Sequence, residues 1–132
     1  MDETRIALPS SAAGARNAVA LVLAGHLGLR GAELREHPLV GDALLATSEL
    51  ATNAIRHGGG ISGFRTDITA EGLVLRISDS SPREPDSSGA GDPTAPGGFG
   101  WPMIQRLASH IAVTRDEGGG KSITLVLPLP RP

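Results

Sequence analysis

The chain has 132 residues, of which 39% are hydrophobic, and a formal net charge of −2. This length suits one domain with a single buried core, and the small net charge argues against nucleic acid or a membrane surface as the main partner. The sequence contains no cysteine, which excludes disulfides and thiolate metal sites, and its four histidines lack the spacing of metal ligands. Trp101 and two phenylalanines are the only aromatic residues, too few for a base-stacking surface.

The N-terminal stretch "MDETRIALPSS" is acidic and lacks the apolar run of a secretion signal. No segment is long and apolar enough to span a bilayer, so we expect a cytoplasmic protein without membrane insertion. Residues 4–9 form a short predicted first strand that ends at Pro9. Ser10 or Ser11 can cap a helix over about 12–29. The apolar residues on the inner side of this helix are Ala15, Val19, Val22, Leu23 and Leu27.

After a polar connection, "GAELREHP", a second helix is predicted from Pro38 to His57, with Gly58 in the left-handed conformation that often ends helices. Its polar side carries Asp42, Glu49, Asn53 and Arg56. An acid and an amide thus lie one turn apart in the stretch "SELATNAIRHGGG". The opposite, apolar face recurs at helical spacing and comprises Val40, Ala43, Leu44, Thr47, Leu50, Ala51, Ala54 and Ile55.

Two strands follow at 63–69 and 73–78, joined by a hairpin turn. Residues 79–98 have no periodicity, which is typical of a functional lid or a disordered loop. A third helix begins near Gly100 or Trp101, with a buried stripe of Ile104, Leu107, Ala108 and Ile111. Strands at 110–115 and 121–128 close the chain. This order predicts a two-layer α/β sandwich, with a mixed, mostly antiparallel sheet covered on one face by helices.

Several short motifs allow a functional and a structural interpretation. The "GGFG" run, residues 97–100, places free amides at a helix start, where they can bind phosphate or simply form a hinge. Asp79 can accept a hydrogen bond from an exocyclic amine or form a turn. Asn53 can supply a neutral Mg²⁺ ligand and Glu49 can activate a nucleophile, although a solvated helix face is the commoner explanation.

The segment "EGGGKS" is not a P-loop. That motif requires a glycine six residues before its lysine, and Arg115 stands there. A strand, rather than a helix, is also predicted after Ser122. The glycines at 118–120 are therefore interpreted as a hairpin loop.

Taken in order, these motifs resemble the histidine-kinase-like ATPases, with the Bergerat ATP-binding fold, over about residues 8–128. "DALLATSELATNAIRHG" is similar to the N box of that superfamily, and "LVLRISDSSP" to its first glycine-box region. "GGFGWPMIQRLA" is similar to the second box and "GGGKSITLVLPLP" to the last. Within the superfamily, the chain looks most like the single-domain anti-sigma-factor serine/threonine kinases.

The resemblance implies ATP and Mg²⁺ as cofactors and assigns a role to each candidate residue. Glu49 would be the general base, Asn53 the Mg²⁺ ligand and Asp79 the partner of the adenine amine. Ser122 would stand where the family has a threonine that helps at the adenine. Residues 80–97 would form the ATP lid. The phosphates would be cradled by the amides around Gly98, Phe99 and Gly100, with Arg56 near them or simply at the helix end.

Two departures from the family pattern weaken the case for catalysis. The expected Asp-x-Gly-x-Gly is Asp79-Ser80-Ser81-Pro82, and Phe99 replaces an arginine that often meets the terminal phosphates. The resemblance implies a serine/threonine kinase whose partner is a sigma factor, an anti-sigma antagonist or both, with a homodimer as one arrangement. The alternatives are a non-catalytic binding module that keeps the fold, and an ATPase subunit of a larger membrane or GTPase assembly.

Overall fold

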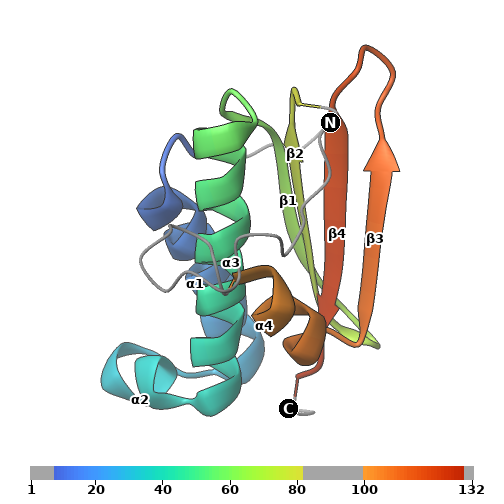
Figure 1. The fold of residues 1–132 in the computed structure, drawn as a ribbon. Coiled ribbons are helices and arrows are strands. Elements are labelled where there is room, and N and C mark those ends of the chain that lie inside the picture. The colour runs from blue at the N-terminus through green and yellow to red at the C-terminus, as the bar shows by residue number, and fades with distance from the viewer. Residues whose placement is uncertain (1–7, 82–99, 130–132) are drawn as a thin grey trace, which may run out of the picture.

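The computed structural model describes residues 8–81 and 100–129 (Figure 1). These two segments contain four helices and four strands. In chain order they are α1 (Ala12–Leu27), α2 (Gly31–Glu36), α3 (Pro38–His57), β1 (Ile61–Thr69), β2 (Gly72–Asp79), α4 (Gly100–Leu107), β3 (His110–Arg115) and β4 (Lys121–Leu127).

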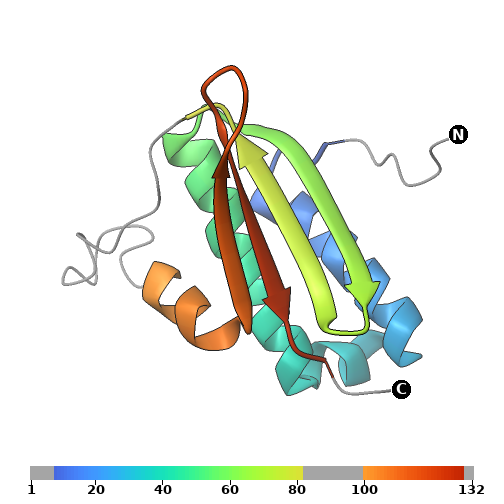
Figure 2. The same cartoon turned by 90° about the vertical axis from the view of Figure 1, so that its right-hand side faces the viewer.

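The four strands form one antiparallel sheet in the order β1-β2-β4-β3. Helices α1, α3 and α4 lie against one face, and the other face of the sheet is open (Figure 2). The predicted two-layer α/β sandwich is therefore confirmed, and every strand pair among the described residues is antiparallel. The connection from β2 to β4 passes through α4 and β3, so the two central strands come from distant parts of the chain.

Successive side chains along the central strands point to opposite faces of the sheet. On β2, Leu73, Leu75 and Ile77 are buried under the helices, whereas Arg76 between them is exposed. On β4, the buried side chains of Ile123, Leu125 and Leu127 face the same layer. The antiparallel register places Leu75 beside Leu125 and Asp79 beside Lys121. At the end of β2 and the start of β4, the side chains on the helix-facing side are therefore an acid and a base, not hydrophobic residues.

Helix α3 is the central helix, and its apolar face supplies much of the core. The buried residues on it are Val40, Ala43, Ala46, Thr47, Leu50, Ala51 and Ala54. Thr47 is accommodated there because its hydroxyl donates a 2.7 Å hydrogen bond to the Ala43 carbonyl. The prediction for Ile55 is wrong: this side chain is 39% exposed because it lies at the edge of the buried stripe.

The helix boundaries differ from the prediction at several points. "GAELRE" is a short helix, α2, rather than a polar connection, because Leu34 is buried against the core. Helix α1 ends at Leu27, since Gly28 adopts a φ of 68°. Gly58 has a φ of −110°, and Gly59 and Gly60 have the positive φ values of 80° and 111° instead.

The end of α4 also differs from the prediction, and two predicted segments lie wholly or partly outside the described residues. Helix α4 ends at Leu107, and Ile111 lies in β3 instead of extending the helical stripe. Of the predicted first strand, Leu8 and Pro9 form no strand and residues 4–7 lie outside the described residues. Most of the predicted lid, residues 82–97, also lies outside them. None of the helices in the described segments has the length and hydrophobicity needed to cross a membrane.

Two leucines on α3 test the assignment of its core face. Leu50 is 1% exposed and Leu45 is 53% exposed. We expect Leu50→Ala to lower the free energy of unfolding by about 2–5 kcal/mol, because it leaves a cavity between helix and sheet. Leu45→Ala, the matched control, should change it by less than about 0.5 kcal/mol. Urea denaturation followed by circular dichroism measures both, and equal losses would contradict the orientation of α3.

Candidate functional site

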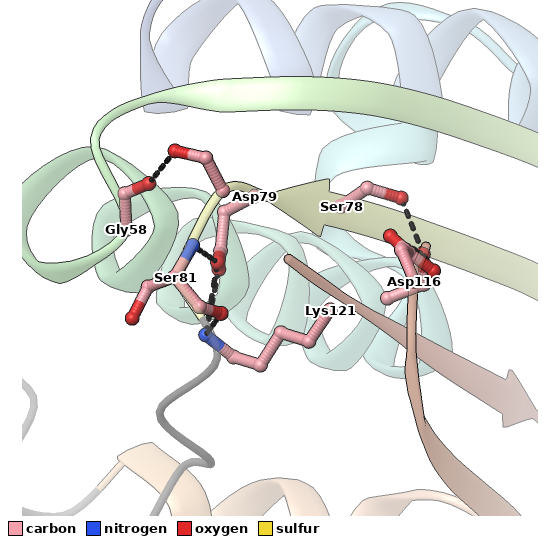
Figure 3. Close-up of polar contacts among 8 residues, drawn as sticks. Gly58, Ser78, Asp79, Ser81, Asp116 and Lys121 are labelled. Carbon is pink, nitrogen blue, oxygen red and sulfur yellow. Dashed lines mark hydrogen bonds and ion pairs between the residues drawn. The ribbon is translucent and has the colours of Figure 1, made fainter. Parts of the chain in front are cut away.

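Asp79 lies where three elements meet: the end of β2, the start of β4 and the C-terminal end of α3. The Ser80 amide and hydroxyl both donate to the Gly58 carbonyl, at 3.1 and 2.8 Å. Gly58 itself follows the last turn of α3, where its amide donates to the Ala54 carbonyl. These bonds tie the end of the helix to the end of the strand (Figure 3).

Two glycines allow the chain to approach Asp79 closely. A β-carbon on Gly58 would overlap the Asp79 carboxylate, and one on Gly120 would overlap the Asp79 carbonyl oxygen. Neither glycine has a positive φ, so the requirement is for space rather than for a left-handed backbone. Glycine at both positions lets α3 and β4 close tightly around the end of β2.

The Asp79 carboxylate is held by Lys121, the only lysine of the chain. The ammonium nitrogen lies 3.0 Å from Oδ1 and 2.9 Å from Oδ2, and it also donates to the Ser81 carbonyl at 3.4 Å (Figure 3). The Ser81 amide donates to Oδ1 at 2.9 Å. Both side chains are nearly inaccessible, at 7% and 6% exposure for Lys121 and Asp79. The structure thus contains a buried, hydrogen-bonded ion pair at this corner.

Ser122, predicted to lie at the adenine, lies on the opposite face of the sheet from Asp79. Its hydroxyl is 2.7 Å from the Ser78 hydroxyl and donates to Asp116 at 3.0 and 3.1 Å. The cause is the antiparallel register, which pairs Asp79 with Lys121 and Ser78 with Ser122. The structure therefore does not bring Ser122 to Asp79, and it places Lys121 there instead.

Glu49 meets the first residue of α4. A β-carbon on Gly100 would overlap Glu49 Oε2, so a larger residue at position 100 would force the Glu49 side chain to move. The same Oε2 is buried and has no hydrogen-bond partner among the residues that the structure describes. An unpaired buried carboxylate oxygen costs free energy unless a donor reaches it. The arrangement leaves Glu49 with an unfilled acceptor position beside the start of a helix.

The remaining candidates occupy the C-terminal part of α3 and the segment before α4. Asn53 is half-buried one turn after Glu49, and its side chain forms no hydrogen bond within residues 8–81 and 100–129. Arg56 is exposed in the last turn of α3. Gly98 and Phe99 lie outside the described residues. The structure thus places Glu49, Asn53 and Arg56 in order along one helix that leads to Asp79.

Lys121 is the site residue that the sequence interpretation missed. The segment "EGGGKS" lacks the P-loop pattern, and the resemblance to the last box of the family assigns a role to Ser122 but none to Lys121. The signal was nevertheless present, because Asp79 ends one predicted strand and Lys121 begins another. Recognising the pair required the strand order, which puts β4 directly beside β2.

Comparison with known proteins places this arrangement in a family. Residues 7–127 match the family described as Histidine kinase-like ATPase domain. No curated protein sequence matches the chain. Among solved structures, the chain is similar to the blue-light activated histidine kinase of Erythrobacter litoralis EL346, with a TM-score of 0.51 and 21% identity over 86% of this chain.

The same fold is found in a separate structure of the histidine kinase domain of that protein, with a TM-score of 0.51 and 20% identity. That alignment covers 98% of this chain and 72% of the domain. The chain spans only 40% of the longer kinase structure. At these identities the likeness shows the fold, and it does not show that the chemistry is shared.

Gly58 provides a test of the close contact around Asp79. We expect Gly58→Ala to lower the free energy of unfolding by about 1–3 kcal/mol, since the new methyl group must displace a buried carboxylate. Gly25→Ala is the control: Gly25 is an exposed residue of α1 with no atom within 4 Å of the added methyl group. It should stabilise the protein by about 1 kcal/mol. Thermal and urea unfolding of both variants measure the difference, and a harmless Gly58→Ala would disprove the contact.

Proposed function

We propose that this chain, which belongs to the histidine kinase-like ATPase domain family, binds Mg-ATP and phosphorylates a serine or threonine of a partner protein. By resemblance to the anti-sigma-factor kinases, the partner is a sigma factor or an anti-sigma antagonist, and the consequence is control of transcription. Family membership supports ATP binding. The kinase activity and the partner rest on the site residues and on the resemblance.

The observation that carries the kinase proposal is the position of Glu49. Its Oε2 is buried, receives no hydrogen bond from any residue in the described part of the chain, and lies against Gly100 at the start of α4. A hydroxyl or water beside this oxygen would supply the missing donor and would be oriented by it. A glutamate that served only as a solvated surface residue would not have an unpaired oxygen shielded from water.

The phosphate end of the site fits Mg-ATP. The Asn53 side-chain oxygen is available as a neutral metal ligand one turn from Glu49, and the absence of a side chain at Gly100 leaves the α4 backbone close to this region. Phosphate oxygens and water would complete the coordination of an ion held by Asn53. Bound Mg²⁺ supplies charge neutralisation for the phosphates. Glu49 would accept the proton of the attacking hydroxyl while the hydroxyl oxygen bonds to the terminal phosphorus and the bond to the leaving ADP breaks, and Asn53 would hold the Mg²⁺ on the phosphates.

A non-catalytic binding module remains the second candidate, and one observation favours it. The Asp79 carboxylate, expected to meet the adenine amine, already accepts hydrogen bonds from Lys121 and Ser81. If Asp79 keeps these internal hydrogen bonds, its contact with the adenine is weaker, and so is nucleotide binding. Phe99, in place of the family's arginine, supplies no positive charge for the phosphates. In this alternative the chain regulates its partner by contact alone.

Glu49→Gln separates these two functions. We expect this variant to bind Mg-ATP with nearly unchanged affinity and to lose turnover by about a hundredfold or more, as expected for a general base. Asp42→Asn removes one charge elsewhere on the polar side of α3 and should change neither quantity. The partner is first captured from the native cell extract with and without Mg-ATP, and phosphate transfer to the bound protein is then measured. A wild-type chain without measurable transfer would favour the non-catalytic module.

Asn53→Ala tests the metal ligand. We expect it to weaken Mg-ATP binding by roughly tenfold or more, the effect of losing one contact to a charged group worth about 1.5 kcal/mol. Binding of ATP without Mg²⁺ should change much less. Calorimetry with and without Mg²⁺ measures both, and circular dichroism controls for folding. Equal effects in the two conditions would exclude Asn53 as the magnesium ligand.

A further inference from the structure

The Asp79–Lys121 pair occupies a position where a nucleotide site would need a free acceptor. Lys121 directs its ammonium group at both carboxylate oxygens and at the Ser81 carbonyl. These three contacts account for the three hydrogens of the ammonium group. The Ser81 amide also donates a hydrogen bond to Oδ1, so Asp79 accepts two hydrogen bonds on Oδ1 and one on Oδ2.

A carboxylate offers about four lone-pair positions, so one remains, on Oδ2. An incoming base amine can donate to this position, or it can replace Lys121. In either case it gains less than it would from a carboxylate with no internal donor. The lysine therefore competes with the base for Asp79.

The positive charge also changes which bases the site accepts. A lone buried carboxylate rejects a keto group, because two acceptors then face each other and both remain unpaired. The ammonium group beside the carboxylate can turn one of its hydrogens from the Ser81 carbonyl, its longest contact at 3.4 Å, to the keto oxygen of guanine. Lys121 thus weakens the adenine amine contact and removes part of the penalty against guanine.

We propose that Lys121 is a specificity-determining residue of the nucleotide site: it competes with the purine base for Asp79 and lowers the preference for adenine over guanine. The inference rests on the proposed function, because it requires that a purine nucleotide binds at Asp79. The site residues predicted from the sequence include Ser122 from β4, whereas this inference adds Lys121, which lies on the helix-facing side of the same strand.

Lys121→Met is the direct test, because methionine keeps an apolar stem of similar length and removes the ammonium group. Calorimetry with Mg-ATP and Mg-GTP is carried out on the wild type, Lys121→Met and the control Arg65→Gln. Arg65 lies in β1 with a side chain that is 71% exposed, so the control removes the same charge outside the site. We expect the ratio of ATP to GTP affinity to rise about tenfold or more in Lys121→Met only, the scale of one hydrogen bond to a charged group.

The outcomes distinguish this inference from the proposed function. An unchanged affinity ratio in Lys121→Met, with ATP still bound by the wild type, overturns the inference alone. Absence of binding in every protein overturns both. Binding of ATP by Lys121→Met but not by the wild type supports competition by the lysine and contradicts ATP binding by the native chain.

A second variant covers the case in which Lys121→Met does not fold. Lys121→Thr also removes the ammonium group, and its β-branched side chain suits a strand. The same rise in the affinity ratio is expected, and circular dichroism establishes which variant is folded. If the folded variant keeps the wild-type ratio, Lys121 has no part in base selection.

A spectroscopic measurement on the wild type tests the competition itself. Lys121 is the only lysine, so ¹⁵N-lysine labelling gives a single side-chain ammonium signal in nuclear magnetic resonance. We expect a signal protected from solvent exchange in the free protein and lost in Asp79→Asn. Saturating Mg-ATP should shift or broaden it. A signal that saturating Mg-ATP leaves unchanged would show that the base does not compete with the lysine.

Discussion

The burial of one face of α3 fixes the rotation of this helix, and the candidate site depends on that rotation. Seven residues from Val40 to Ala54 are buried on it, at the spacing of a helix with 3.6 residues per turn. The helix cannot turn about its axis without exposing them. Glu49 and Asn53 are consequently held at the margin of the helix layer, where Glu49 meets the start of α4. Hydrophobic burial therefore orients two polar side chains that contribute nothing to the core.

The same helix links the two ends of the proposed site. Glu49 lies beside Gly100, and nine residues later Gly58 touches Asp79. At 1.5 Å per residue, these two contacts are on the order of 13 Å apart along the axis. The bonds from Ser80 to the Gly58 carbonyl prevent the end of β2 from moving away from the helix. A rigid element thus sets the separation between the candidate catalytic group and the candidate base contact.

Much of this fold could be predicted from the sequence because its elements have strong periodic patterns. The apolar face of residues 38–57 predicted α3 with its correct bounds, and alternation predicted the strands that became β1 to β4. Predictions failed where tertiary contacts decide the conformation. The six-residue helix α2 has too few residues for a clear period, and burial of Leu34 stabilises it. Gly58 lacks a positive φ because Gly59 and Gly60 make the turn out of the helix.

The site was predictable only as far as single elements define it. Glu49 and Asn53 share one helix, so their proximity followed from spacing. The choice between Lys121 and Ser122 as the neighbour of Asp79 depends on strand order and register, which no local pattern contains. A shift of one residue exchanges the two faces of a strand. The resemblance identified the segment that enters β4, and the register determined which of its side chains faces the helices.

The energetics of the Asp79–Lys121 pair suggest that fold stability alone does not explain it. Removing two charges from water costs several kcal/mol for each ion, and the attraction between them seldom exceeds this cost. Replacing such a pair with well-packed hydrophobic residues is often neutral or stabilising. The remainder of the helix-facing side of β2 and β4 is hydrophobic, from Leu73 to Ile77 and from Ile123 to Leu127. Hydrophobic residues at positions 79 and 121 would have extended the core to this corner without the cost of desolvating two charges. The pair instead lies at the one corner where the helix, the sheet and the glycine at position 120 meet. A buried ion pair in such a place holds a carboxylate in a fixed position, which a site that must recognise a polar ligand requires and a hydrophobic core does not.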